Sequence, residues 1–277
     1  FGRWPFPRKH YQTVLANLKK NGVKWIGFDA IFSESEHTQL SDASTHLKKI
    51  TELTKTQGNQ KKEIKNTLEK IQDLSKLSPG DKSFADAISE FENVVLGYFY
   101  FKSPFELQES GRQDTPFLGL DDMESSEVPI PLLPEGRELN SYPSALKAYG
   151  LTSNIPQITK ASEHAAFFNN EPDSDAIVRQ ATLVRIINNR LMPSLSLKVA
   201  AEILNSDILV EFDKQGIQAI DLIDRDDETK VLKIPTDPTS RGRLLINYRG
   251  PKETVPYFSF ADAYNNRGIA LYNLKMY

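Results

Sequence analysis

Apolar residues at helical spacing, followed by strongly apolar runs, organise the first hundred residues. Tyr11, Val14, Leu15 and Leu18 form one apolar helix face, and Asn21-Gly22 is typical of the end of that helix. Residues 23–32 and 94–101 are rich in β-branched and aromatic side chains and apolar on both faces, which is typical of strands covered on two sides. A short helix capped by Asp81 is predicted between them. This alternation predicts an α/β fold.

The rest of the chain continues the alternation with shorter elements. Helices are predicted at 144–149, 195–204 and from 259 to 264, and strands at 165–169, 177–187, 232–234 and 244–248. No repeat of roughly 20 to 50 residues is present. We therefore expect a mixed, largely parallel central sheet flanked by helices.

Residues 36–79 differ in composition, because Lys, Glu, Gln, Thr, Leu and Ile dominate and aromatic residues are almost absent. Apolar residues at heptad spacing on either side of Gly58-Asn59 predict an inserted antiparallel helical hairpin. Two roles stay open for it: packing on the body or on itself, or contact with a partner or a second copy.

The segment from 102 to 141 is rich in Pro, Asp and Ser, and its prolines prevent long helices. It is interpreted as a surface loop.

With 277 residues, one domain carrying an insertion competes with two domains. We favour a single domain over residues 1–277.

Charge and cysteine content narrow the function classes. A net charge of −3 gives no general attraction to phosphate backbones, so no nucleic-acid partner is expected. The absence of Cys removes disulfides, thiolate zinc sites and cysteine nucleophiles, and it fits an exported bacterial domain. There is no apolar run of about 18 residues, so any membrane anchors are expected outside this chain. The start at Phe1 favours an excised fragment.

Motifs for enzyme chemistry and cofactors are missing from the sequence. It has no Walker-type or dinucleotide fingerprint and no Gly-x-Ser-x-Gly. The four His residues do not share a helical ligand spacing, and His164 is interpreted as a surface residue near a strand. The acidic run at 224–227 lacks calcium-loop register and is interpreted as solvated. We predict no cofactor, no metal site and no catalytic residue.

Carboxylates give the more informative candidates. Asp29 lies in an apolar run, where an ionised group needs a partner or a cleft. Asp29 either belongs to a ligand site at the end of a strand or makes a structural bond to a neighbouring loop or helix N-terminus. Asp173 and Asp175 lie at a predicted turn, where Asp commonly bonds its own backbone, and Arg179 on the next strand could pair with either. Ligand or metal binding is the alternative for this turn.

Several segments in this order resemble one family. They are residues 3–8, 26–34, 80–88, 93–96, 167–169, 172–179, 193–197 and 242–251. Together they resemble the second class of CHASE domains, which are extracytoplasmic sensors of bacterial adenylate cyclases, histidine kinases and related receptors. The resemblance covers almost the whole chain apart from the helical insertion and the Pro-rich loop.

The resemblance implies a non-enzymatic sensor on the periplasmic or extracellular side of the inner membrane, in a protein anchored by transmembrane segments. Its matching positions supply the candidate ligand-binding residues, which are Asp29, Asn169, Asp173, Asp175, Arg179, Asn247 and Arg249. Ala176 replaces the family's turn Gly, so a positive φ is not expected there. The final strand of the family is represented by a fragment around 267–272, and the closing part of a ligand cleft is expected to be altered.

The implied partner is an unknown small molecule or a periplasmic protein, and a homodimer is a further candidate. A competing hypothesis is a periplasmic carboxylate-dependent hydrolase or solute-binding protein that uses Asp29 and Asp175 as a pair. A third is a structural module whose helical hairpin binds another protein.

Overall fold

A computed structural model describes residues 6–36, 79–237, 242–251 and 254–267. The predicted hairpin at 36–79 and the fragment at 267–272 lie almost wholly outside the described residues. The helices are α1 (Arg8–Lys20), α4 (Pro79–Phe91), α5 (Pro104–Glu109), α6 (Pro156–Thr159), α7 (Leu195–Ile203) and α8 (Phe260–Tyr264), with the 3₁₀ turns η1 (Asp121–Ser126), η2 (Leu139–Ser141) and η3 (Ser144–Leu146). None of the described helices combines the length and the apolar character needed to cross a bilayer.

The described strands form four sheets, and parallel and antiparallel pairs are mixed. In the first, β2 (Val94–Phe101) pairs in parallel with β1 (Ile26–Phe28) and β6 (His164–Phe167), and antiparallel with β5 (Gly150–Thr152). The second has the order β12 (Val231–Ile234), β11 (Ile217–Asp224), β10 (Ser206–Phe212), β3 (Ile130–Leu132). The third sheet has the order β13 (Thr236–Asp237), β14 (Arg243–Leu245), β7 (Gln180–Thr182). The fourth has the order β4 (Lys147–Ala148), β8 (Val184–Ile187), β9 (Arg190–Pro193).

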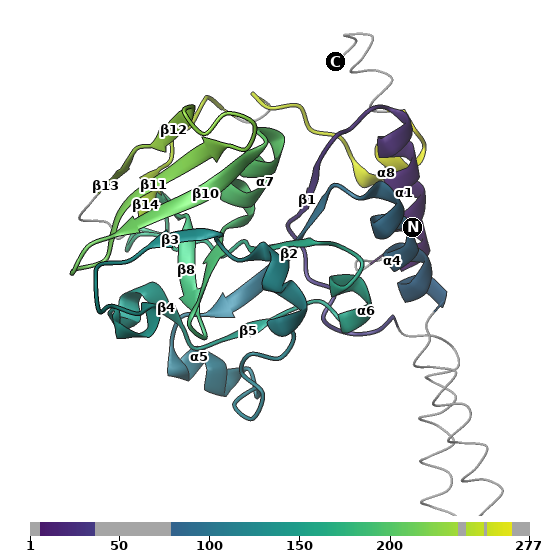
Figure 1. Ribbon diagram of the computed structural model, residues 1–277. Helices are drawn as coiled ribbons and strands as arrows, with labels where there is room; N and C mark the ends of the chain where they lie inside the picture. The colour runs from purple at the N-terminus through teal and green to yellow at the C-terminus, as the bar shows by residue number, and fades with distance from the viewer. Residues whose placement is uncertain (1–5, 37–78, 238–241, 252–253, 268–277) are drawn as a thin grey trace, which may run out of the picture.

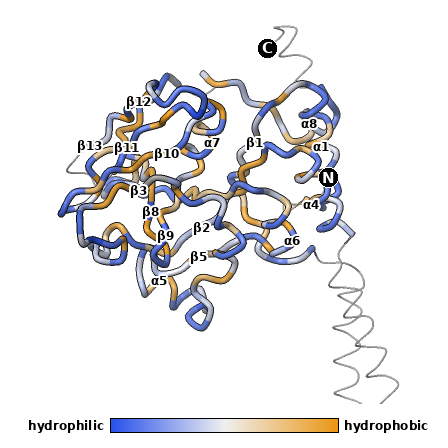
Figure 2. The backbone as a smooth tube through the Cα atoms, in the orientation of Figure 1, coloured by the Kyte–Doolittle hydropathy of each residue, from blue (hydrophilic) through white to orange (hydrophobic). Residues whose placement is uncertain are grey.

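The α/β class is confirmed, but the strands are distributed among several sheets where we expected one central sheet. The reason lies in the side-chain pattern of the strands. Along β2 almost every residue is buried, whereas β10 alternates between buried and more exposed residues. A strand that is buried on both faces is typical of parallel pairing. A strand that alternates between buried and exposed residues is typical of an antiparallel sheet with one face in solvent. Figure 2 shows hydrophobic residues along both β10 and β11.

Helices α1, α4 and α8 gather on one side of the molecule (Figure 1) and enclose an aromatic core. Tyr11 contacts the rings of Phe32, Phe84 and Phe260 at centroid distances of 5.3, 5.2 and 5.0 Å. Because Phe260 belongs to α8, helices near the start and the end of the chain share one core. Asn17 adds hydrogen bonds from Nδ2 to the α8 carbonyls of residues 263 and 264, at 3.0 and 2.7 Å.

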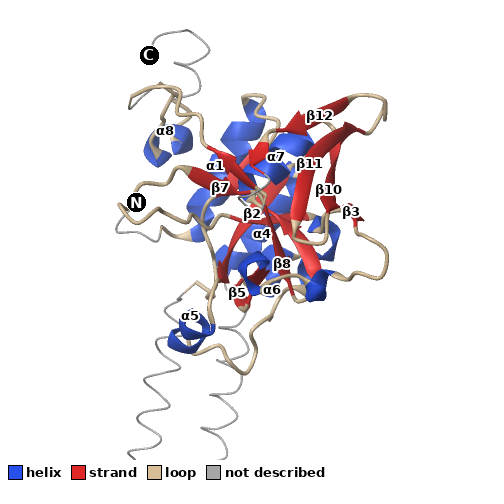
Figure 3. Cartoon of the chain, turned by 90° about the vertical axis from the view of Figure 1, so that its left-hand side faces the viewer, coloured by secondary structure: helices blue, strands red, loops and turns tan. Residues whose placement is uncertain are grey.

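The second large core lies under the sheet of β3, β10, β11 and β12. Figure 3 shows the strands of this sheet side by side. Helix α7 supplies Leu197 and Ala201 to this core and also contacts β1, β2 and β6 of the first sheet. It therefore bridges the two main sheets. Its first turn is fixed by Ser194, whose hydroxyl accepts a hydrogen bond from the backbone N–H of Leu197 at 3.3 Å.

Several local predictions need correction. The strand predicted at 23–32 covers only 26–28, and the helix predicted at 144–149 is one 3₁₀ turn followed by β4. The segment 102–141 is not simply a surface loop, because it contains α5, η1, β3 and η2. Met123 and Leu120 are almost completely buried there. Burial of isolated large apolar residues orders this segment although its prolines keep every helix short.

Candidate functional site

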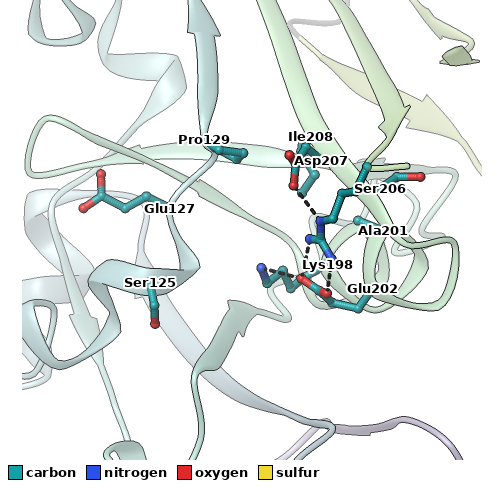
Figure 4. Close-up of a pocket in the computed structure, with 10 residues that line it drawn as sticks. Ser125, Glu127, Pro129, Lys198, Ala201, Glu202, Ser206, Asp207 and Ile208 are labelled. Carbon is teal, nitrogen blue, oxygen red and sulfur yellow. Dashed lines mark hydrogen bonds and ion pairs between the residues drawn. The ribbon is translucent and has the colours of Figure 1, made fainter. Parts of the chain in front are cut away.

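A small polar pocket opens where α7, β10 and the segment after η1 meet, with a volume of about 130 Å³. Figure 4 shows its lining, in which Lys198, Ala201 and Glu202 come from α7, Asp207 and Ile208 from β10, and Ser125, Glu127 and Pro129 from the opposite side. The chain turns directly from α7 into β10, through Asn205 at φ 50°. This tight connection places the last turn of the helix against the first residues of the strand.

Strand pairing brings Arg225 into the same pocket. In the antiparallel register of β10 and β11, Ser206 lies opposite Asp224, so Arg225 follows beside the start of β10. Its guanidinium donates from Nη1 and Nη2 to the two carboxylate oxygens of Glu202, at 2.9 and 3.2 Å, and from Nε to Asp207 at 2.8 Å. A two-pronged pair of this kind fixes both geometry and charge.

Glu202 is the centre of the ion-pair network. Its side chain is only 4% exposed, and Lys198, one helical turn earlier, approaches its carboxylate at 2.8 Å. Burial alone would raise the pKa of Glu202, but hydrogen bonds from Arg225 and Lys198 outweigh it and hold the pKa at about 2. Hydrogen bonds to Glu202 also raise the pKa of Arg225. Glu202 and Arg225 are therefore both ionised at neutral pH.

His164 connects this network to the first sheet. Its Nδ1 lies 3.7 Å from Glu202 Oε1, is buried, and has no hydrogen-bond partner among the described residues. Burial lowers the pKa of His164, with Lys198 adding to the effect, so the ring is neutral at neutral pH. Trp25 packs against the ring at 5.2 Å. His164 was expected at the surface, but its side chain is only 19% exposed.

The predicted turn residues Asp173, Asp175 and Arg179 do come together. Arg179 pairs with both carboxylates, at 2.9 Å to Asp173 and 2.7 Å to Asp175, which confirms the predicted pairing. Asp175 also accepts a hydrogen bond from the backbone N–H of Ile177 at 3.2 Å. Hydrogen bonds from Arg179 and from this N–H lower the pKa of Asp175. All three side chains are more than 40% exposed, so their present contacts brace a surface turn.

Ala176, at the tip of this turn, corrects an expectation. It adopts φ 64°, the left-handed conformation that was not expected without Gly. The hydrogen bond between the N–H of Asp173 and the carbonyl of Ile177, at 2.9 Å, closes the loop around it and imposes that conformation. The ion pairs of Arg179 reinforce the closure. The turn is therefore kept at some conformational cost.

Replacing Ala176 by Gly should stabilise the protein by about 0.5–1 kcal/mol, because Gly adopts this φ without a Cβ clash. Urea unfolding measures the change. Ala200→Gly, within α7, is the opposite control and should destabilise by about 1 kcal/mol. Equal losses in both variants would show that the left-handed conformation at 176 is not a cost.

The other candidate residues have separate roles. Asn169 hydrogen-bonds the backbone of Tyr100 through both side-chain atoms, at 2.9 Å each, and so extends the pairing of β6 with β2. Asp29 follows the last residue of β1, and Asn247 and Arg249 follow β14; all three are exposed. Within the described residues no hydrogen bond or ion pair joins Asp29 to Asp175. Ligand binding by these residues stays a prediction.

A second polar cluster was missed by the sequence reasoning. Glu171 accepts hydrogen bonds from Tyr100 at 3.0 Å, from Arg185 at 2.5 Å and from Arg243 at 2.8 Å. The Arg185 guanidinium also lies 4.8 Å from the Tyr100 ring centre. The cluster ties β2, β8 and β14 together, and each of its members comes from a different part of the chain. No described group of three or more His, Cys, Asp or Glu side chains is arranged to hold a metal ion.

Comparison with known proteins identifies the family. The family model of the CHASE2 domain matches residues 1–275, essentially the whole chain. No curated protein and no solved structure gives a significant match. The match confirms the resemblance found in the ordered sequence segments. The chain therefore belongs to the CHASE2 family of extracytoplasmic sensor domains.

Proposed function

We propose that this domain is the signal-sensing part of a membrane-anchored bacterial receptor whose output is an adenylate cyclase, a histidine kinase or a similar module. The observation that carries the proposal is the CHASE2 match over residues 1–275. The signal is the binding of a small molecule or a protein partner outside the cytoplasm. Such binding shifts a conformational equilibrium in proportion to its different affinity for the two states.

The packing supplies a physical route for that shift. Glu202 on α7 faces His164 on β6, and the ring of His164 contacts Trp25 in the connection between α1 and β1. Helix α1 is in turn held to α8 by Asn17 and by Phe260. A displacement of α7 would therefore reach the paired helices α1 and α8 through these side-chain contacts and the short connection between Trp25 and α1.

Cysteine labelling tests the location. Because the chain has no Cys, Ser174→Cys in the exposed turn gives the full-length protein a single reporter within this domain. We expect a membrane-impermeant maleimide to label it in cells whose inner membrane is intact. Ser194→Cys is the matched control, since residue 194 is 6% exposed and should react only after unfolding. Labelling of residue 174 only after the inner membrane is opened would refute the proposal.

The coupling of α1 to α8 can be tested at Asn17. Asn17→Ala removes two hydrogen bonds to α8 carbonyls, so we expect amide exchange in residues 260–267 to accelerate by roughly tenfold or more. Hydrogen exchange with mass spectrometry provides the measurement. Gln12→Ala, at an exposed position of the same helix, should leave the exchange unchanged. In the full-length receptor, Asn17→Ala should also alter the basal output.

A further inference from the structure

Within the part of the chain that the structure describes, the donors of the pocket beside α7 outnumber the acceptors that they contact. Lys198 carries three N–H donors on its ammonium group, and Glu202 takes one of them at 2.8 Å. Arg225 has five donors, of which Glu202 and Asp207 take three. The remaining donors are available to an acceptor from outside the network.

The ammonium group of Lys198 is the donor best placed to meet a ligand. Figure 4 shows it directed into the space between α7 and the segment carrying Ser125 and Glu127. The carboxylate of Glu127 points away from that space, and it is paired with Arg190 at 3.2 Å. Lys198 is only 7% exposed, so little water surrounds its ammonium group. An anion that reaches this group therefore forms a charge-assisted hydrogen bond that is partly shielded from solvent.

A smaller part of the lining is apolar. Pro129 is exposed there, and the almost completely buried Ala201 and Ile208 also line the pocket. A volume of about 130 Å³ is slightly smaller than that of a cavity known to hold benzene, a ring of six carbon atoms. The ligand should thus combine one anionic head with a short hydrocarbon part.

We propose that this pocket binds a short-chain carboxylate of about the size of propionate, with the carboxylate on Lys198 and the hydrocarbon part against Pro129, Ala201 and Ile208. The proposal rests on the proposed sensing function and names its ligand class. The bound carboxylate competes with Glu202 for Lys198. It thereby changes the contacts at the end of α7 that face His164.

Titration calorimetry on the 277-residue chain tests the ligand class, with acetate, propionate, butyrate and propylamine as probes. We expect saturable binding of propionate and butyrate and none of propylamine, which has a similar size and the opposite charge. The affinity attainable per atom by a five-atom ligand limits the Kd of propionate to no tighter than about 3 µM.

Three variants locate the site. Lys198→Gln should weaken propionate binding by about 10- to 100-fold, because it removes one charge-assisted hydrogen bond. Ser125→Trp places a bulky ring at an exposed position of the pocket mouth and should weaken binding without changing the charges. Lys214→Gln, in the exposed turn between β10 and β11, should bind as the unchanged protein does. Circular dichroism verifies that each variant is folded.

Absence of binding by all three carboxylates, equal binding by Lys198→Gln, or preference for propylamine would each overturn the ligand assignment. The outcome is separable from that of the proposed function. If residue 174 is labelled from outside the cytoplasm but no carboxylate binds, the receptor role stands and the ligand class is wrong. If carboxylates bind but residue 174 is reached only from the cytoplasm, the site stands and the receptor role fails.

Discussion

Asp81→Asn should destabilise the fold by about 3–5 kcal/mol, the loss typical of breaking one side of a buried ion pair. Asp81 is completely buried in α4 and pairs with Arg8 of α1, which is 8% exposed. Arg8 also donates to the carbonyl of Glu34, and the backbone N–H of Glu36 donates to Asp81 at 3.1 Å. The amide of the Asp81→Asn variant would leave the buried guanidinium of Arg8 without the negative charge of Asp81. This change would weaken the contacts that α1 makes with α4 and with the chain that follows β1.

Urea unfolding monitored by tryptophan fluorescence provides the measurement. The matched control is Asp86→Asn on the same helix, where the carboxylate is 61% exposed and pairs with Lys82 at 2.6 Å. An exposed pair of this kind contributes about 0–1 kcal/mol. Similar losses in the two variants would contradict the conclusion that Asp81 and Arg8 form a buried ion pair that stabilises the fold.

Glu202 should make the stability of the domain depend steeply on acid. Its folded pKa of about 2 is below the ordinary value of 4.5, so its ionisation contributes stability that is complete above about pH 4.5. This contribution, about 3 kcal/mol, is lost as pH falls from 4.5 towards 2. Protonation leaves Arg225 and Lys198 facing a neutral acid in a buried position.

Unfolding free energies of the unchanged protein and of Glu202→Gln, measured between pH 2 and 7, isolate this contribution. The variant should be less stable at neutral pH and should lack the Glu202 component of the acid dependence. Glu211→Gln, at an exposed position of β10, is the control and should keep the full profile. Parallel pH profiles in all three proteins would mean that Glu202 is not the group responsible.

The sequence predicts elements well where one strong pattern decides them. Helices α1 and α7 and strand β2 have long apolar faces or runs, and their predicted positions agree closely with the structure. Helix α4 is also present, but it begins at Pro79, so Asp81 lies inside the helix and pairs with Arg8 where we expected a cap. The hairpin of β10 and β11 was not resolved beyond an alternation of short strands and turns. Neither strand has a strictly alternating sequence, and each becomes a stable strand only by pairing with the other.

The pocket could not be predicted for a related reason. Lys198 and Glu202 are visible as a pair one helical turn apart, a spacing that is common on solvated helix faces. Arg225 lies in an acidic run that was interpreted as solvated. It joins them only through the register of β10 and β11. By contrast, the contacts of Asp175 with Arg179 are local, and the sequence was sufficient to predict that pair.

The packing of α1 on α8 also affects how the protein is made. The hydrogen bond from Asn17 to the carbonyl of Ala263 joins residues 246 positions apart. Tyr11 and Phe6 acquire their contacts with Phe260 only when α8 has been synthesised. Until then the side of Tyr11 that faces Phe260 lacks its cover, although Phe32 and Phe84 already contact the ring. The aromatic core is thus completed only after all strands of both main sheets have been synthesised.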